Sequence, residues 1–422
     1  MYLLGKKFFI MPSKRVSIYP IVLTVFIQMM GNSMVTPIFA VLIISASGVF
    51  YPLYDQAQRN ILYGVLLTMY PLAQFFGAPV IGALSDRFGR KKLIMVSIFG
   101  TLVSYVIIAI GIATVNIGLI LVGKLVDGFT GGDIAVVNSA VADISDAASK
   151  PKNFGAVGMG IGFGLIVGPF LGGILSNPAI LPWFTALTPF YLGMALVSVN
   201  LLWLTFRFPE TSKEKKRTPV TWKTGFRNLK KAFSKETTRS IFAITFLWWF
   251  GFNFFLQFMH SFLIQKFGFD QLLIGVTFGY IGIWVASTQG FFIRPALRFV
   301  QPRKLMRISL LTLSLGLGGL LLMVNPWFLL IVAPCIAISN GLTMPMMTTM
   351  VSNSVGREEQ GEILGINQSV LAVAQMLPPL LAGVVATVNV NAPIALASAV
   401  VFCAWMLYMR HTRSISPTIV HV

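Results

Sequence analysis

Three ionisable side chains, Lys124, Asp127 and Asp133, lie inside one strongly apolar stretch of this sequence. A charged group in hydrocarbon is costly, so such residues usually have a partner and face a cavity. Lys124 and Asp127 are three positions apart and share a helix face, whereas Asp133 points about 120° away from Asp127 and lies roughly 9 Å further along the axis. One of the two acids is therefore predicted to carry a proton, with Asp133 favoured because no cation lies near it in the sequence. The alternative is a structural ion pair beside an acid that pairs with another helix.

Other polar side chains in apolar stretches are candidates for contact with a bound molecule. Pockets for organic molecules are mostly apolar with a few polar groups. His260 is the one histidine in such a stretch and is a further candidate for proton coupling, since histidine titrates near neutral pH, but a packing or substrate-contacting role is favoured. The amide candidates for a substrate cavity are Gln28, Asn32, Asn138, Asn253, Gln257, Gln289, Asn340 and Asn367.

The composition indicates which environment surrounds these residues. Of 422 residues, 56% are hydrophobic and 11% are charged, less than half of the ~25% usual in soluble domains. A net charge of +19 would suit nucleic acid, but a mean hydropathy of +0.80 indicates a lipid bilayer instead. Cys335 and Cys403 match no metal or disulfide spacing, and the sequence contains no nucleotide-binding loop and no nucleophile–base pair. We therefore expect neither an enzyme nor a bound metal or cofactor.

Apolar runs between polar breaks predict an all-α polytopic membrane protein with twelve transmembrane helices, because about 20 apolar residues cross the hydrocarbon core. The first run begins at Val16 and is too long for a cleaved signal, so it is expected to be retained. The predicted spans are 17–44, 61–84, 93–113, 118–140, 154–176, 182–206, 240–264, 272–293, 305–323, 327–350, 363–386 and 393–410.

Basic residues fall almost entirely on one side of these spans. With the N-terminus inside, 29 of the 32 Lys and Arg residues lie in inner segments, and only Arg59 and Lys266 lie in outer ones. Because inner loops of membrane proteins are enriched in Lys and Arg, both termini are predicted to be cytoplasmic.

The chain also divides into two similar halves. Pro169 in the fifth span and Pro379 in the eleventh are 210 positions apart, and Gly173 and Gly383 share that offset. This spacing predicts two six-helix pseudo-repeats, residues 1–207 and 239–422, joined by a cytoplasmic linker at 208–238. The basic linker is expected to be a solvated connection rather than a regulatory or lipid-contacting surface.

A charge-rich segment joins the second and third spans and contains Gly82, Asp86, Arg87, Gly89 and Arg90, followed by two lysines. Glycine permits a tight turn and close helix approach there. The segment resembles the G-x-L-x-D-R-x-G-R-[KR] loop of the major facilitator superfamily. In that family the loop acid, its second arginine and an acid ending span four form a charge relay, which the resemblance places on Asp86, Arg90 and Asp143. We expect this relay to hold the cytoplasmic side closed in the outward-open state.

The fifth span has regularly spaced small residues and a proline, namely Gly155, Gly164, Gly168, Pro169, Gly172 and Gly173. Small residues let helices pack closely in lipid, and proline bends a helix, so packing alone would also explain them. The spacing resembles the antiporter signature of drug:proton exporters in the same superfamily, which favours export.

The segments 123–146, 208–211 and 361–383 are similar to tetracycline/proton antiporters. Two features depart from that family. Its span-one acid falls on Gln28, and the histidine of its eighth span is absent, with Val285 near that position. The usual site of proton binding is therefore not present in its usual form.

The resemblance implies a secondary active transporter that exports a small organic or amphipathic compound in exchange for protons, through a site between the halves near mid-membrane. The alternatives are an importer or symporter of a metabolite or siderophore, and a non-transporting membrane sensor or assembly factor with this fold. We expect the protein to be a monomer. We expect it to lie in the cell membrane, as a protein of the inner membrane of a bacterium. Its expected partners are a small-molecule substrate, protons and the lipid bilayer, without nucleic acid.

Overall fold

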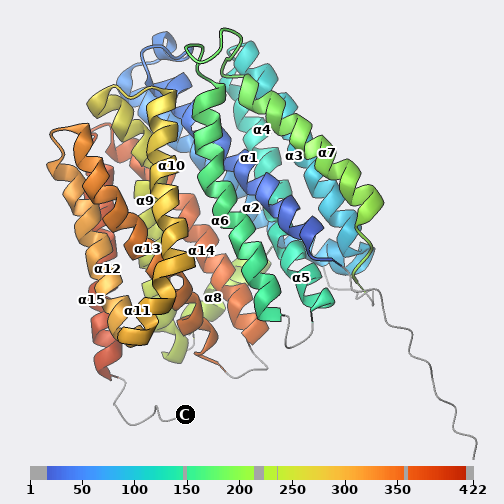
Figure 1. Ribbon diagram of the computed structural model, residues 1–422, viewed down its shortest axis with the longest axis vertical. Coiled ribbons are helices and arrows are strands. Elements are labelled where there is room, and N and C mark those ends of the chain that lie inside the picture. The colour runs from blue at the N-terminus through green and yellow to red at the C-terminus, as the bar shows by residue number, and fades with distance from the viewer. Residues whose placement is uncertain (1–16, 146–149, 213–222, 235, 356–359, 415–422) are drawn as a thin grey trace, which may run out of the picture.

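The computed structural model describes residues 17–145, 150–212, 223–234, 236–355 and 360–414, and this part of the chain forms a bundle of helices without strands (Figure 1). Eleven of the described helices are long and apolar enough to cross a membrane. These helices are α1 (Tyr19–Ile44), α2 (Gln56–Phe88), α3 (Arg90–Ala113), α6 (Lys150–Leu175), α7 (Thr188–Arg207), α9 (Glu236–Phe267), α10 (Gln271–Ser287), α12 (Pro302–Gly319), α13 (Leu329–Ser352), α14 (Gln360–Val385) and α15 (Ala392–Ser414).

The predicted fourth span, 118–140, is present but is not one continuous helix. It consists of α4 (Ile117–Thr130), the 3-10 turn η2 (Gly131–Asp133) and α5 (Ile134–Ile144). Two adjacent glycines, Gly131 and Gly132, weaken the helix at this point because glycine is a poor helix former. With this broken helix the chain has the expected twelve spans in two pseudo-repeats.

Several other segments differ from the predicted boundaries. Helix α2 is longer than 61–84 at both ends. Its early start is explained by a reciprocal capping box between Asp55 and Gln58, and its later end is at Phe88, before Gly89. The eighth span continues from α10 through a π-turn, η3 (Thr288–Phe292), into α11 (Ile293–Phe299). Three short 3-10 turns lie between the helices, η1 (Tyr51–Leu53), η4 (Leu320–Leu322) and η5 (Pro326–Phe328).

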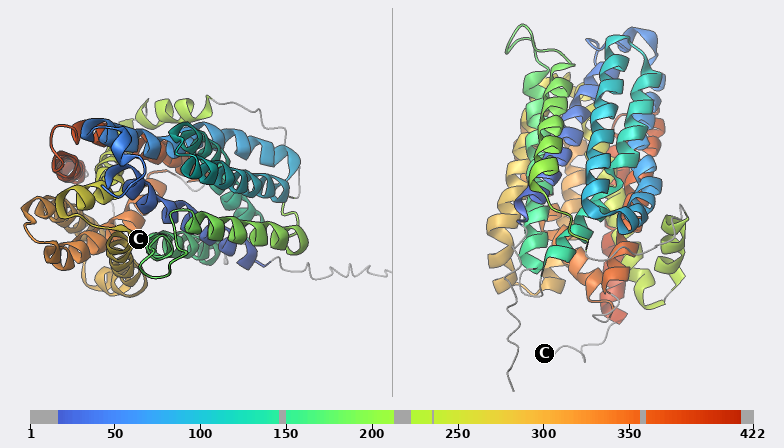
Figure 2. Two further views of the ribbon diagram at one scale, coloured as in Figure 1. Left: turned by 90° about the horizontal axis from the view of Figure 1, so that it is seen from above. Right: turned by 90° about the vertical axis from the view of Figure 1, so that its right-hand side faces the viewer.

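The linker contains a short helix, α8 (Thr224–Ser234), that packs beside the bundle (Figure 2). The ring of Phe226 contacts that of Phe75 on α2, with centroids 5.2 Å apart, and the Asn228 amide donates to the hydroxyl of Ser369 on α14 at 3.1 Å. This part of the linker is therefore docked on both halves of the protein rather than wholly solvated as expected.

Each half is held together by its own helix pairs, and the two halves meet along two further pairs. In the first half α6 packs on α1, and α4 packs on α2 and α3. In the second half α15 packs on α9 and α12, and α13 packs on α10 and α12. The halves meet where α2 packs on α14 and α6 packs on α10. Figure 1 shows α6 and α10 side by side at the front of the bundle.

Paired glycines make both contacts between the halves possible. A Cβ atom on Gly173 would lie 3.0 Å from the Cα of Gly275, and one on Gly64 would lie 3.0 Å from the Cα of Gly383. Gly173 follows Pro169 by four residues, as Gly383 follows Pro379, so the two contacts are related by the internal repeat. Small residues are what allow backbones in lipid to approach this closely.

We call the end of the bundle where α1 begins and α15 ends the basic end, because Arg87, Arg90, Lys91 and Lys92 lie there at the junction of α2 and α3. Both paired-glycine contacts lie toward the other end, near the start of α2 and of α10. In this conformation the halves are therefore closely joined at the end opposite the basic end.

We expect Gly173→Ala to destabilise the bundle, because the added methyl group would lie 2.5 Å from the carbonyl oxygen of Gln271 and would force α6 away from α10. Overpacking of this kind costs ~1–3 kcal/mol, which would appear as a lower apparent unfolding temperature in detergent. Gly162→Ala is the matched control, because it lies on the same helix with nothing within 4 Å of the added atom. Equal unfolding temperatures for the two variants would contradict this account of the contact.

Candidate functional site

The buried charges of the fourth span form one ion pair. The ammonium of Lys124 lies 3.4 Å from a carboxylate oxygen of Asp127, one turn along α4, and donates to the side-chain oxygen of Asn32 on α1 at 3.1 Å. The ring of Tyr70 lies beneath the ammonium, with its centroid 4.9 Å away. Lys124 and Asp127 are 4% and 3% exposed, so this is a compensated pair inside the bundle.

Asp133 is equally buried, at 2% exposure, but has a neutral partner. Its carboxylate accepts a hydrogen bond of 2.7 Å from the side-chain amide of Gln28 on α1. Among the described side chains, no Lys, Arg or His nitrogen lies within 4.0 Å of it, and the three ion pairs found there do not include it. The structure therefore separates the two acids as their spacing predicts, and brings Gln28 to Asp133 and Asn32 to Lys124.

The break between α4 and α5 places Asp133 where it meets α1. Gly128 and Gly132 have no room for a side chain, because a Cβ on either would collide with the backbone of α2. This close approach also lets the Gln74 amide of α2 donate to the carbonyl of Gly131 at 2.9 Å. A backbone acceptor freed by the helix break is thus satisfied inside the bundle, as buried carbonyl groups require.

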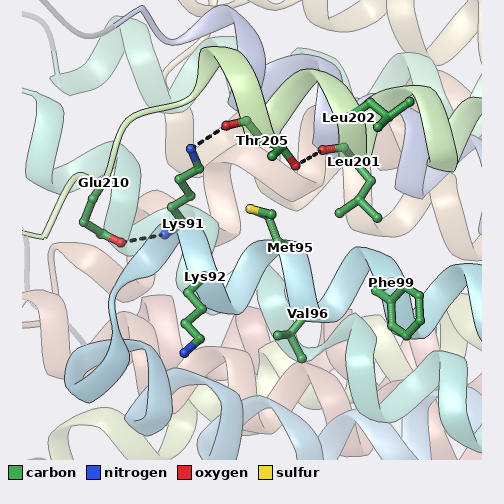
Figure 3. Close-up of a pocket in the computed structure, with 9 residues that line it drawn as sticks. All are labelled: Lys91, Lys92, Met95, Val96, Phe99, Leu201, Leu202, Thr205 and Glu210. Atoms are coloured by element: carbon green, nitrogen blue, oxygen red, sulfur yellow. Dashed lines mark hydrogen bonds between the residues drawn. The ribbon is translucent and has the colours of Figure 1, made fainter.

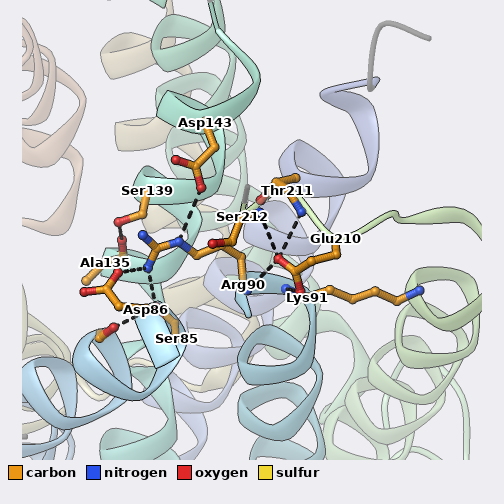
Figure 4. Close-up of polar contacts among 11 residues, drawn as sticks. Ser85, Asp86, Arg90, Lys91, Ala135, Ser139, Asp143, Glu210, Thr211 and Ser212 are labelled. Atoms are coloured by element: carbon orange, nitrogen blue, oxygen red, sulfur yellow. Dashed lines mark hydrogen bonds and ion pairs between the residues drawn. The ribbon is translucent and has the colours of Figure 1, made fainter. Parts of the chain in front are cut away.

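At the basic end, the charges of the motif gather around Arg90 (Figure 4). Its guanidinium lies 2.6 Å from Asp86 and 3.4 Å from Asp143 near the end of α5, and it also donates to the hydroxyl of Ser85. The three residues of the expected relay therefore lie together, but all of them belong to the first half, so their ion pairs do not join the two halves. Arg87 is directed elsewhere, with its guanidinium 5.2 Å from the ring centroid of Phe88.

The two glycines of the motif behave differently. Gly89 has a φ of 104°, which favours glycine, and a side chain there would collide with the carboxylate of Glu210. Gly82 lies inside α2, and a Cβ atom added to it would have nothing within 4 Å, so the close approach expected there is not observed.

Glu210 is a residue of this site that we did not expect from the sequence. Its carboxylate accepts hydrogen bonds from the first two amides of α3, those of Arg90 at 2.8 Å and Lys91 at 3.3 Å, and from the amides of Thr211 and Ser212 (Figure 4). It therefore caps α3 from the segment after α7. The only available signal was the similarity of residues 208–211 to tetracycline/proton antiporters, which gave Glu210 no role.

Glycines of the fifth span pack α6 against its neighbours. Side chains at Gly164, Gly168 or Gly172 would collide with α1 between Met29 and Met34, while Gly173 and Pro169 face α10. Gly155 lies outside the residues whose side chains are described. The regular spacing therefore produces close contact between α6 and two other helices.

The predicted cavity residues of the second half are mostly buried and incompletely hydrogen-bonded. His260 stacks on Phe278 with ring centroids 4.1 Å apart, and neither ring nitrogen has a partner. The side-chain oxygens of Asn253, Asn340 and Asn367 are likewise buried without a partner. Gln257 is half-buried, and Gln289 is exposed on η3. Asn138, the cavity candidate on α5 of the first half, is also half-buried. No hydrogen bond between side chains joins these residues to one another in the described structure.

We expect Glu210→Gln to loosen the start of α3, because the variant loses the negative charge and one acceptor oxygen at a helix N-terminus. Caps of this kind contribute roughly 1 kcal/mol, so amide hydrogen exchange at Arg90 and Lys91 should accelerate about fivefold. Asp270→Asn is the control, because Asp270 caps α10 in the same way and does not contact α3. Unchanged exchange at the start of α3 would show that Glu210 is not the cap.

Comparison with known proteins places the fold and the motifs in one family. The sequence matches the model of the Major Facilitator Superfamily over residues 21–379 and 290–419. It is 28% identical to the tetracycline resistance protein, class C, of Escherichia coli, over 76% of this chain and 78% of that protein. It is also 28% identical to multidrug resistance protein 1 of Bacillus subtilis (strain 168), over 79% of this chain and 83% of that protein.

Solved structures agree at the level of the fold. The crystal structure of the human organic anion transporter MFSD10 (TETRAN) superposes with a TM-score of 0.69 at 20% identity, covering 94% of this chain and all of the other (100%). The crystal structure of a D-xylose-proton symporter superposes with a TM-score of 0.74 at 13% identity, covering 93% of this chain and 96% of the other. The chain is a multi-pass membrane protein that belongs to the major facilitator superfamily.

Proposed function

We propose that this protein is a secondary active transporter that exports a small organic or amphipathic compound in exchange for protons, and that it is not an enzyme. The observation that carries the proposal is a buried carboxyl group, Asp133, with an amide rather than a cation as its partner. The relatives named as tetracycline and multidrug resistance proteins support export over import.

The balance of buried charge supports Asp133 as the proton-binding residue. Lys124 and Asp127 neutralise each other, so neither needs a further ion to remain in the bundle. Asp133 has no such partner, and a carboxylate in a low-dielectric interior is stabilised by pairing or by protonation. A proton taken up at Asp133 removes the uncompensated charge, and its release restores it.

The contact between Asp133 and Gln28 supports the same assignment. In the family this sequence resembles, a span-one acid would stand at Gln28. Here the carboxyl group comes from the start of α5 instead and lies 2.7 Å from the Gln28 amide. The acid therefore lies on the fourth span of this chain, at its contact with the first span.

Helix α5 would couple the proton to the gate. Asp133 precedes its first residue and Asp143 is its next-to-last residue, so about 15 Å of one helix separates the two acids. Asp143 contacts Arg90, which also holds Asp86. A movement of α5 away from Gln28 on protonation would therefore be transmitted to the charge cluster at the basic end.

We further propose that the basic end faces the cytoplasm of a bacterial cell, as the excess of Lys and Arg there favours. The paired-glycine contacts would then close the outer side, and alternating access would open them as the halves rock. The Arg90 cluster is formed while the outer side is closed, so we propose that it is not confined to the outward-open state as the resemblance implied. A monomer suffices for this mechanism, because both halves of the pathway come from one chain.

The first test is Asp133→Asn, which keeps the shape of the side chain but cannot bind and release a proton. In proteoliposomes with a panel of amphipathic compounds that begins with tetracycline, we expect accumulation driven by a pH gradient to be lost, while counterflow without a gradient persists. Asp55→Asn, at an exposed helix cap, should behave as the wild type. Accumulation by Asp133→Asn that still follows the pH gradient would refute the assignment.

The second test concerns the gate. Asp86→Asn removes one of the two carboxylates that hold Arg90, so the populations of the open and closed states should shift. A change of ~1.4 kcal/mol in the free-energy difference between the open and closed states changes the ratio of their populations about tenfold. We expect counterflow to slow by roughly that factor. Asp270→Asn is the control at the opposite end. A normal transport rate for Asp86→Asn would exclude the relay from the cycle.

A further inference from the structure

A groove runs between α3 and α7 on the outer face of the bundle, at the basic end (Figure 3). Its volume is about 560 Å³. Lys91, Lys92, Thr205 and Glu210 form its polar mouth, and below them the walls are apolar, formed by Met95, Val96, Phe99, Leu201 and Leu202. The groove therefore has a charged head and an apolar body.

The charge at the mouth is positive. The Glu210 carboxylate is occupied by four backbone amides, so its negative charge is directed at the start of α3 rather than at the lysines. The Lys91 ammonium donates to the carbonyl of Thr205 at 2.8 Å, and that of Lys92 lies 5.8 Å from the ring centroid of Phe88. No described acid forms an ion pair with either lysine.

The apolar walls face the surroundings of the bundle. Val96, Phe99 and Leu202 are 54%, 55% and 60% exposed, which for a membrane protein means contact with hydrocarbon chains. From Lys92 to Phe99 the axis of α3 rises by roughly 10 Å, so a chain that enters at the mouth runs along the groove over several methylene groups.

We propose that this groove binds an anionic phospholipid of the leaflet at the basic end. Its phosphate would lie at the ammonium of Lys92, with further attraction from Lys91, and one acyl chain would lie between α3 and α7. A free phosphate would leave the apolar walls bare, and a peptide would have to bring unpaired backbone groups into hydrocarbon. The proposal depends on membrane insertion and not on the direction or substrate of transport.

The position of the groove links lipid charge to the gate. Lys91 joins α3 to α7 through Thr205, and its backbone amide is one of those capped by Glu210. The adjacent residue, Arg90, holds the relay. A lipid phosphate at the mouth would therefore add a negative charge beside the start of the helix on which the charge cluster depends.

The test measures lipid retention by the purified full-length protein. Native mass spectrometry would follow titration with dioleoyl phosphatidylglycerol or, with identical chains, dioleoyl phosphatidylcholine. We expect the wild type to retain the anionic lipid preferentially and Lys92→Gln to weaken this retention about fivefold, the effect of one basic residue near an anionic headgroup. Lys304→Gln, an exposed lysine at the start of α12, removes the same charge from the basic end away from the groove and should retain the lipid as the wild type does.

A second variant tests the apolar body. Leu202→Trp fills the groove without a change of charge and should also weaken retention, whereas an excess of inorganic phosphate should not displace the lipid. Equal losses for Lys92→Gln and Lys304→Gln would show general attraction to a basic surface and would overturn the proposal. Displacement by phosphate, unchanged retention in Leu202→Trp, or equal retention of the two lipids would overturn it as well.

Discussion

The cost of placing charge in hydrocarbon governs this structure. Three ionisable groups on the fourth span must each be compensated inside the bundle, and the chain does so in two different ways. Lys124 and Asp127 compensate each other one turn apart, as an ion pair. Asp133 receives only an amide, from Gln28. The first arrangement is an ion pair, whereas the second leaves a carboxyl group without a cation, which is why we propose Asp133 as the proton-binding group.

Close helix contact is the second requirement, because helices in lipid are not driven together by the hydrophobic effect. Glycines allow this close contact between the helices that position Asp133. Gly128 and Gly132 bring α4 and η2 against α2, and glycines of α6 bring that helix against α1, which carries Gln28. The contacts between the halves use one glycine pair each, Gly64 with Gly383 and Gly173 with Gly275. Many contacts within a half and only two principal helix pairs between the halves suit movement of each half as a unit.

The sequence predicted those features that depend on residue type and regular spacing. Hydropathy gave the twelve spans, a three-residue interval gave the Lys124–Asp127 pair, and a 210-residue offset gave the proline and glycine positions that proved to lie at contacts between the halves. Features that depend on tertiary contact were not predictable. The hydrogen bond from Gln28 to Asp133 joins residues 105 apart, and Glu210 caps a helix that begins 120 residues earlier. The break at Gly131 was not predicted because the apolar stretch continues through it. Helix α8 was not predicted because its many basic residues indicated a solvated segment.

The position of the unpaired acid explains why that break matters. A continuous helix would keep Asp133 in a fixed rotation relative to Asp127, about 120° apart, and both acids would move together with α4. The 3-10 turn instead lies between Asp127 and α5. Asp127 remains on α4 with its lysine, while Asp133 immediately precedes α5, whose other end carries Asp143 to Arg90. One short helix therefore has a buried acid at its start and a gate acid near its end. This arrangement is the basis of the proposed coupling between proton binding at Asp133 and the charge cluster around Arg90.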